Sequence, residues 1–217
     1  MKTIHIFGGG TVSYIRNHLA LCAPAYGNTA RYLQEYMHGR WADSYLHLTK
    51  MADPQHSTME TNDDVWARLQ KLVNDPTTGV IIMNAALCDY NGSVCLPNEQ
   101  GSGSTTIKSG KHEPRLRTIE GRQSVVLTPA AKIISGIKRS RPDIYVVGFK
   151  TTTNATDADQ VRRASGLLAS GCDLVLANDT TTRNNILCWN GTCVRESRDS
   201  LLSLLADTVI HAVTPDP

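Results

Sequence analysis

Small and polar residues follow four predicted buried strands, at the points where those strands end. In a mostly parallel sheet the carboxyl ends of the strands meet at one edge, and ligands bind in the crevice outside that edge. The sequence therefore predicts one shared site, suited to an anion or a nucleotide. The four segments are residues 8–11, 85–90, 149–154 and 178–185.

The first segment follows a short apolar strand and consists of Gly8, Gly9, Gly10 and Thr11. Glycines turn the backbone tightly and let a ligand approach it, and free N–H groups at a strand end suit a phosphate. The three glycines are adjacent, so they lack the spacing of the dinucleotide fingerprint. A phosphate-binding loop and a plain turn both stay open for this segment.

The other three segments each hold a residue that can contact a nucleotide. Asp89 can bind a ribose, a base donor or a Mg²⁺-bound phosphate, or it can cap a loop. Phe149 can stack on a base or belong to the core. Asn178 can bond a ligand or form an Asx turn with Asp179.

Three polar side chains lie outside the strand ends and can still take part in chemistry. Asn17 follows the glycine segment, and its amide can bind an acyl phosphate or a carboxylate, or it is a loop residue. Lys108 and Lys111 lie in a polar stretch. A mobile lysine there can neutralise a leaving diphosphate, although a solvated lysine is the commoner case.

The composition indicates a globular protein that needs no nucleic-acid or membrane partner. The 217 residues carry a net charge of only +2, aromatic residues make up 6%, and no apolar run is long enough for a membrane span. The six cysteines and seven histidines show no metal-ligand spacing. With no signal peptide apparent, we expect a cytoplasmic protein with reduced thiols and no metal site built from its own side chains.

Strands alternate with helices along the chain, which predicts a single α/β domain over residues 1–217. We expect a Rossmann-like, doubly wound, mostly parallel sheet with an antiparallel hairpin near the C-terminus, where Asn190 and Gly191 signal a turn. Residues 12–26 read as irregular, and a helix is predicted over residues 129–139. The other predicted helices cover residues 27–37, 62–75, 157–170 and 199–212, and the other predicted strands cover residues 3–7, 44–50, 80–84, 124–127, 143–149 and 173–178.

A polar stretch of about 30 residues, from 91 to 121, interrupts this alternation and contains no core-forming pattern. Connections of this length inside a compact domain usually form a flap, a binding loop or a disordered segment. We call residues 91–121 the strap.

The strand-end segments together resemble those of phosphopantothenoylcysteine synthetases, also called phosphopantothenate–cysteine ligases. The sequence Ala-Ala-Leu-Cys-Asp-Tyr at 85–90 resembles their A-A-V-A-D-Y/W segment, and residues 172–179 resemble their D-x-I-x-A-N-D strand. Residues 8–11 resemble their G-G-T loop, residues 14–17 their Y-I-T/S-N run, and 147–149 their V-G-F strand end. Residues 184–185 resemble the start of their hairpin. Order and spacing agree over nearly the whole chain.

This resemblance implies a reaction in coenzyme A biosynthesis. The carboxylate of 4′-phosphopantothenate attacks the α-phosphate of CTP, or ATP in some branches, which gives an acyl-nucleotide and diphosphate. The amine of L-cysteine then displaces the nucleotide. The family implies Mg²⁺, a homodimer and a strap that helps form it. The flavin-binding decarboxylase domain of many relatives is absent from this sequence, so we expect no FMN.

The resemblance also assigns roles to residues of this chain. Asn17 takes the acyl-phosphate position, and Lys108 can stand in for the strap lysine. The glycine segment and Asn178 become walls of the nucleotide site. The implied nucleotide contacts are Ala85, Asp89, Pro129, Ala130, Ala131 and Phe149, with 129–131 as a helix start whose free N–H groups suit a phosphate.

Several cationic positions of the family are neutral in this chain. The first strap lysine is Thr106, two further lysines fall on Gly166 and Ser170, and an arginine falls on Ser13. Each charge-assisted contact is worth roughly 1.5–3 kcal/mol, so their loss lowers the affinity for a triphosphate. Nearby candidates to replace them are Arg16, Lys108, Lys111, Lys150, Arg162 and Arg163.

Two other functions compete with the ligase. The missing cations favour a divergent relative that binds a different nucleotide or anion without ligating. A nicotinamide oxidoreductase is the third possibility, but the chain lacks both G-x-G-x-x-G and an acidic residue at the end of the second strand.

Overall fold

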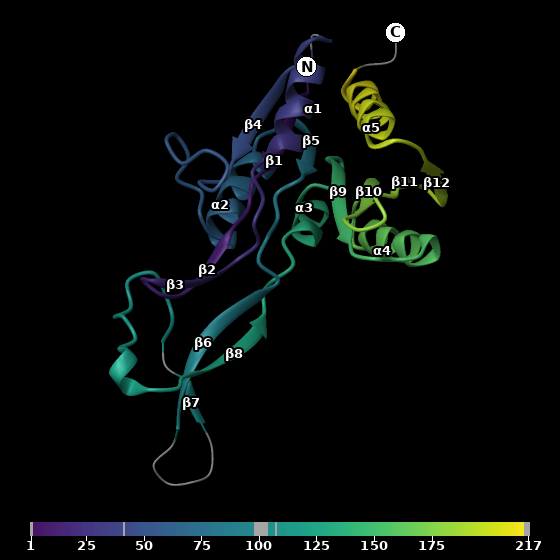
Figure 1. Cartoon of the computed structure of the whole chain (residues 1–217). Coiled ribbons are helices and arrows are strands. Elements are labelled where there is room, and N and C mark those ends of the chain that lie inside the picture. The colour runs from purple at the N-terminus through teal and green to yellow at the C-terminus, as the bar shows by residue number, and fades with distance from the viewer. Residues whose placement is uncertain (1, 41, 98–103, 107, 215–217) are drawn as a thin grey trace.

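A seven-stranded sheet forms the centre of the computed structural model, which describes residues 2–40, 42–97, 104–106 and 108–214 (Figure 1). Its strand order is β12-β11-β10-β9-β5-β1-β4. The five adjacent strands from β10 to β4 are parallel, whereas β11 and β12 pair antiparallel with their neighbours. This arrangement confirms the predicted fold class. The strands are β1 (Thr3–Gly8), β4 (Ser44–Leu48), β5 (Thr78–Met83), β9 (Tyr145–Thr152), β10 (Leu174–Asp179), β11 (Asn185–Trp189) and β12 (Thr192–Arg195).

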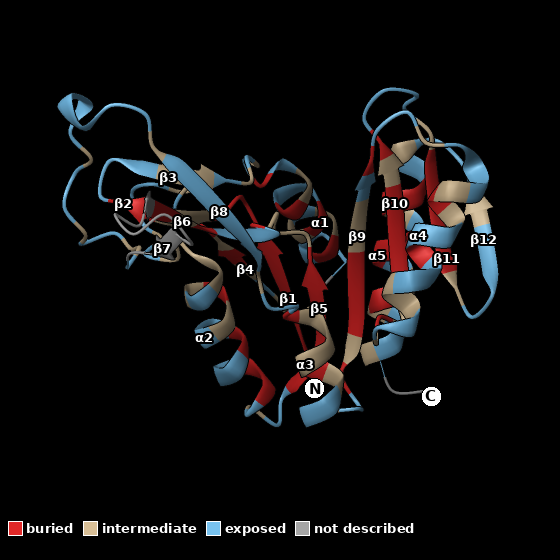
Figure 2. Cartoon of the chain, turned by 90° about the horizontal axis from the view of Figure 1, so that it is seen from below, coloured by how far each residue is buried: buried red, intermediate tan, exposed pale blue. Residues whose placement is uncertain are grey.

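Helices cover both faces of this sheet, which explains why its central strands are apolar without alternation. In β5, Ile81 and Met83 pack into one core cluster, whereas Val80 and Ile82 pack into the other. Figure 2 shows β1, β5 and β10 as buried over most of their length, and β9 as buried in its first half. One face carries α1 (Asn28–His38) and α5 (Arg198–Val213), and the other carries α2 (Asn62–Val73), α3 (Ile134–Ser140) and α4 (Asp157–Ala169).

Local capping fixes where the predicted helices begin. Thr61 caps α2 through a capping box with Asp64, and Thr156 caps α4. In α5, Leu204 is 39% exposed, whereas Leu202 is buried. Among the described residues no helix is long and apolar enough to cross a membrane.

The prediction of an irregular segment over residues 12–26 is wrong. Strands β2 (Val12–Arg16) and β3 (Leu19–Cys22) form an antiparallel hairpin with Asn17 and His18 as its turn. The hairpin packs on β6, where a side chain in place of Gly92 would collide with Ile15. The signal available in the sequence was the apolar run Leu-Ala-Leu-Cys at 19–22.

The strap contains more regular structure than expected. Strands β6 (Tyr90–Pro97), β7 (Ser104–Thr106) and β8 (Ser124–Pro129) form a separate antiparallel sheet, and a 3₁₀ turn, η1 (Thr118–Glu120), lies between β7 and β8. The predicted strand at 124–127 is therefore confirmed, but it pairs with β6 in this separate sheet rather than with the main sheet. Residues 98–103 and 107 lie outside the described residues.

The predicted helix over residues 129–139 is wrong at its start. Pro129 is the last residue of β8 and pairs with Tyr90, and α3 begins only at Ile134. The N–H of Ala130 already donates to the carbonyl of Asp89, at 2.8 Å. Residues 129–131 consequently do not offer the free helix-start N–H groups that we expected there.

The C-terminal hairpin around Asn190 and Gly191 is confirmed, but the expectation of reduced thiols is wrong for two cysteines. The turn sets a register that puts Cys188 opposite Cys193, and the two form a disulfide with Cα atoms 4.2 Å apart. The other four cysteines are free. The disulfide closes the hairpin at the edge of the main sheet.

Candidate functional site

The glycine segment is packed tightly against the rest of the chain. Gly9 has φ +98°, and a Cβ on it would lie 2.2 Å from Thr49 Oγ1. A Cβ on Gly10 would lie 2.0 Å from the carbonyl oxygen of Ala23. These glycines are required because neighbouring backbone and side chains fill the space above them, and the segment is buried.

Asn62, the first residue of α2, ties two of the four strand ends together. Its Oδ1 accepts from Thr11 Oγ1 at 2.7 Å and from the N–H of Cys88 at 3.1 Å, while its Nδ2 donates to the carbonyl of Cys88 at 2.8 Å. The segment around Ala86 also pairs with Gly10. The predicted segments at 8–11 and 85–90 therefore meet. Sequence reasoning missed Asn62 because the residues around it are explained fully by the start of a helix.

A cleft of about 880 Å³ opens beside this junction. Its walls come from β2, the start of α2, β6, the strap, and the segment that leads into α3. Of the predicted contacts, Ala130 and Ala131 line it. Lining side chains that can bind a ligand are Tyr14, Trp66, Lys111, Lys132 and Arg139.

Lys111 of the strap reaches across to the body of the protein. It forms an ion pair with Glu60 and lies 5.3 Å from the centre of the Tyr14 ring, and Lys50 pairs with Glu60 from the other side. Burial alone would raise the pKa of Glu60, but hydrogen bonds from Lys111, Tyr14 and Lys50 outweigh it and lower that pKa. Glu60 thus stays ionised and holds the strap over the cleft.

Asp89 pairs with a lysine that the sequence argument did not single out. Lys132 Nζ lies 2.7 Å from Asp89 Oδ1, and both side chains are mostly exposed. The hydrogen bond from Lys132 and the charge of Lys150 lower the pKa of Asp89. Two cations therefore gather at the predicted nucleotide contact, although the family positions at Gly166 and Ser170 carry none.

Asn17 and Lys108 come together, but at the tip of the β2–β3 hairpin rather than at the glycine segment. The N–H of Asn17 donates to the carbonyl of Glu113, and Lys108 Nζ pairs with the Glu113 carboxylate at 3.4 Å. Buried Arg16 donates to the backbone carbonyl of Lys108 at 2.6 Å. Six residues of extended chain, about 20 Å, separate Asn17 from Thr11.

The ends of β9 and β10 form a second polar junction, around Asp179. Its carboxylate is 2% exposed and accepts bonds from Thr152 Oγ1 and from four backbone N–H groups of the following loops. Burial opposes ionisation, yet these bonds hold the pKa of Asp179 far below its ordinary value. Phe149 packs partly buried against the core, and Asn178 contacts Thr151.

The candidates for replacing the missing cations lie in different places. Arg16 donates its hydrogen bonds to the backbone carbonyls of Ile15 and Lys108, and Arg162 pairs with Asp159 on α4. Lys111 lines the cleft and Lys150 acts on Asp89. Ser13, at the family's arginine position, donates to Asn91 Oδ1 at 3.1 Å.

The chain is similar in sequence to the bifunctional coenzyme A biosynthesis protein CoaBC of Thermococcus kodakarensis, with 24% identity over 182 residues. The match covers 82% of this chain but only 41% of that protein. The structure matches the C-terminal domain of CoaBC with a TM-score of 0.65 at 15% identity, covering 97% of this chain and 94% of that one. The chain has the fold of the CoaBC C-terminal domain. The predicted resemblance to phosphopantothenoylcysteine synthetases is thereby confirmed.

Other solved structures agree on this CoaBC-type fold. A DNA/pantothenate metabolism flavoprotein from Streptococcus pneumoniae has a TM-score of 0.78 at 20% identity, covering 96% of this chain and 98% of its own. A Cab2 mutant in complex with phosphopantothenate-cysteine has a TM-score of 0.66 at 13% identity, covering 98% and 89%. No family model matches the sequence.

Proposed function

We propose that this protein ligates 4′-phosphopantothenate to L-cysteine at the expense of a nucleoside triphosphate, CTP or ATP. The carboxylate oxygen bonds to the α-phosphorus while the bond to the leaving diphosphate breaks. The cysteine amine then bonds to the acyl carbon, and the nucleoside monophosphate leaves. The observation that carries the proposal is a polar cleft closed by a cationic strap, in a chain related in sequence to CoaBC.

The protein's part in this reaction is to position two anions and to balance charge on phosphorus. We assign the nucleotide to the cleft beside Asp89, with Lys132 and Lys111 as its cations. Both lysines line the cleft, and each is held by a carboxylate that fixes its position. Of the implied nucleotide contacts, Ala130 and Ala131 line this cleft. Ala85, Pro129, Phe149, Asn178 and the segment at 8–11 stay predicted contacts outside its lining.

Asn17 remains our candidate for the acyl-phosphate contact, with Lys108 beside it. Support comes from their shared neighbour Glu113, which joins the hairpin tip to the strap. Because the hairpin extends away from the glycine segment, this role requires the tip and a nucleotide site to approach each other, within one chain or between two. The Asn17→Ala variant should keep nucleotide binding and lose acyl-nucleotide formation.

Mg²⁺ fits this proposal as a companion of the nucleotide. Among the described residues no group of three His, Cys, Asp or Glu side chains can hold a metal ion. Mg²⁺ usually binds through one or two carboxylates together with substrate phosphates, and Asp89 can supply one carboxylate. Neither step changes an oxidation state, so the proposal needs no FMN.

The ligase proposal is tested by incubating the purified protein with phosphopantothenate, cysteine, Mg²⁺ and either CTP or ATP. Diphosphate release that requires all components, with phosphopantothenoylcysteine as product, is the expected result. Release with only one of the nucleotides identifies the co-substrate. No release with any nucleotide would overturn the proposal.

The alternative is a relative of this fold that binds a nucleotide or another anion without ligation. The observation that favours it is the neutral residues at the family's lysine positions, Gly166 and Ser170. Thermal stabilisation by a monophosphate or dinucleotide, but not by CTP or ATP, would select this alternative.

A further inference from the structure

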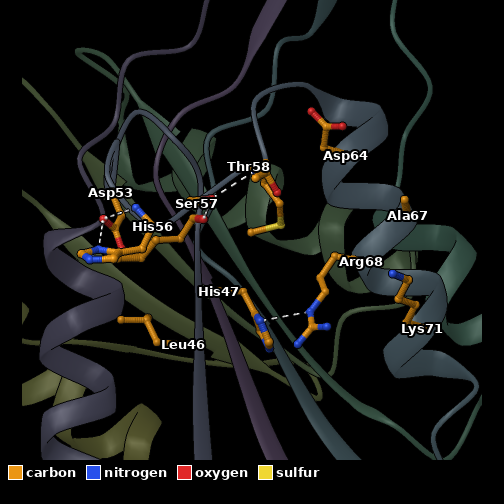
Figure 3. A pocket seen from close by; sticks show the side chains of 12 residues that line it. Leu46, His47, Asp53, His56, Ser57, Thr58, Asp64, Ala67, Arg68 and Lys71 are labelled. Carbon is orange, nitrogen blue, oxygen red and sulfur yellow. Dashed lines mark hydrogen bonds and ion pairs between the residues drawn. The ribbon is translucent and has the colours of Figure 1, made fainter.

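A second cleft, of about 570 Å³, lies at the open edge of the main sheet (Figure 3). It is bounded by edge strand β4, the loop over residues 53–59, and one face of α2. It adjoins the larger cleft, since Thr58 and Asp64 line both. None of the residues that we assigned to the ligase reaction lines it.

Two cations of α2 line this edge cleft. Arg68 and Lys71 are three residues apart, so both side chains point from the same face of the helix. Among the described residues neither has a carboxylate within ion-pair distance, and neither Lys71 Nζ nor the terminal nitrogens of Arg68 have a hydrogen-bond partner. Both charges are therefore available to a ligand.

A buried histidine fixes the orientation of Arg68. Arg68 Nε donates to His47 Nδ1 at 3.3 Å, and Figure 3 shows the two side chains facing each other at the cleft floor. His47 is 8% exposed, and its other nitrogen bonds to His5 at 3.0 Å. The guanidinium is thus held through Nε, which leaves its terminal N–H groups to donate to a ligand.

The acidic groups that line the cleft are already engaged. Asp64 accepts from the backbone N–H groups of Glu60 and Thr61. Asp53 pairs with His56 at 2.9 Å on the opposite wall. Neither carboxylate pairs with Arg68 or Lys71, so the two cations of α2 keep free donors for an anion that enters the cleft.

We propose that the edge cleft is a second phosphate-binding site, in which Arg68 and Lys71 hold a dianionic phosphate group. Two cations match the charge of a phosphate, and the planar guanidinium suits its oxygens. The cleft is larger than a phosphate ion, so it also accepts a diphosphate or a phosphate monoester. This site is separate from the nucleotide contacts around Asp89 and Lys132.

The test uses NMR signals at the site, because phosphate can also enter the larger cleft. Inorganic phosphate and diphosphate are titrated in separate arms into the full chain, with chloride at matched ionic strength as reference. Saturable shifts of the Arg68 Nε–H and the His47 ring signals are expected. The arm with the lower Kd shows whether the site prefers a single phosphate or a diphosphate.

Matched variants give the site assignment. Lys71→Gln should weaken binding about tenfold while keeping the Arg68 and His47 reporters. Lys2→Gln, which removes a surface cation paired with Asp143, should leave the Kd unchanged. Shifts unaffected by Lys71→Gln, or no saturable shift with either anion, would overturn the proposal, whatever the outcome of the ligase assay.

Discussion

At the scale of single residues, the cations of the proposed nucleotide site come from positions that differ from those of the related ligases. Lys132 lies directly before the buried Ile133 and pairs with Asp89, and Lys111 pairs with Glu60. Both lysines line one cleft although they lie 21 positions apart in the sequence. In the proposed site, Lys111 and Lys132 supply the positive charge that the resemblance places at positions 166 and 170.

Removing Lys132 should raise the KM for the nucleotide more than it lowers kcat. Lys132→Met deletes a charge-assisted contact, so we expect the KM for the nucleotide to rise about 10- to 100-fold. Steady-state kinetics in the ligase assay measure this. Lys2→Met, which removes a lysine paired with Asp143 elsewhere on the surface, should leave KM unchanged. An unchanged KM for Lys132→Met would remove this residue from the site.

The buried histidine pair predicts a loss of stability in mild acid. Burial and then the charge of Arg68 lower the pKa of His47 from its ordinary 6.5 to about 3, and burial lowers the pKa of His5. Below pH 6.5 these histidines therefore bind protons in the unfolded chain but stay neutral in the folded protein. The free energy of unfolding should fall as the pH drops below 6.5, by up to about 1.4 kcal/mol per pH unit for each histidine.

Urea unfolding between pH 4.5 and 6.5 tests this histidine effect in a window above most carboxylate titrations. His47→Gln should flatten the dependence of the free energy of unfolding on pH, because the variant lacks one of the two histidines that protonate only on unfolding. His56→Gln changes an exposed histidine and should keep the slope of the natural protein. Equal slopes for both variants would show that the buried pair is not its source.

Residue-level chemistry was only partly predictable from the sequence. The pattern located Asp89 at a strand end, but its partner Lys132 follows a strand whose end was mistaken for a helix start. His5 and His47 looked scattered because 42 positions separate them, and only the pairing of β1 with β4 brings them together. Contacts between distant elements depend on the register in which two strands pair, and this register cannot be derived from a single sequence.

At the scale of elements, α2 carries more of the proposed site than any other helix. Its first turn ties the glycine segment to Cys88 through Asn62, and its next turns line both clefts. The capping box of Thr61 and Asp64 sets where this helix begins. The position of α2 therefore determines the geometry of both clefts together.

Loss of the α2 cap should cost stability by a measurable amount. Thr61→Ala removes the acceptor for the N–H of Asp64, and we expect the free energy of unfolding to fall by about 1 kcal/mol. Urea denaturation measures this change. Thr58→Ala, a nearby exposed threonine outside the cap, should change stability by less than about 0.5 kcal/mol.

Elements with long apolar or capped patterns were predictable, and short ones were not. The run at 80–84 gave β5, and the acidic start after Thr61 gave α2. The β2–β3 hairpin was missed because its strands have only five and four residues. Pro129 favours a helix start by its fixed φ, but pairing with Tyr90 made it a strand end.

At the scale of the whole molecule, the sheet formed by β6, β7 and β8 extends from the body beside the β2–β3 hairpin (Figure 1). All six residues of β8 are exposed, including the apolar Val125, Val126 and Leu127. Tyr90, which pairs with Pro129 at the end of β8, and Ile119 are also exposed apolar residues. An apolar surface of this kind is typical of protein–protein contacts, and we propose a second copy of this chain as the partner.

A charged residue on β8 should separate the proposed homodimer into monomers. Light scattering during size-exclusion chromatography should give about twice the chain mass for the natural protein and one chain mass for Val126→Glu. The variant should remain folded, because Val126 is 42% exposed. A natural protein that runs as a monomer would contradict the proposed dimer.

The hydrogen-bonded row that runs from exposed Arg68 through buried His47, His5 and Thr3 has one further consequence. An arginine can only donate and a backbone carbonyl can only accept, so Arg68 at one end and the carbonyl of Thr77 at the other fix every proton between them in one direction. Both imidazoles must then carry their proton on Nε2. Nitrogen-15 spectra of the rings would display this tautomer, and replacing Arg68 would release the whole row at once.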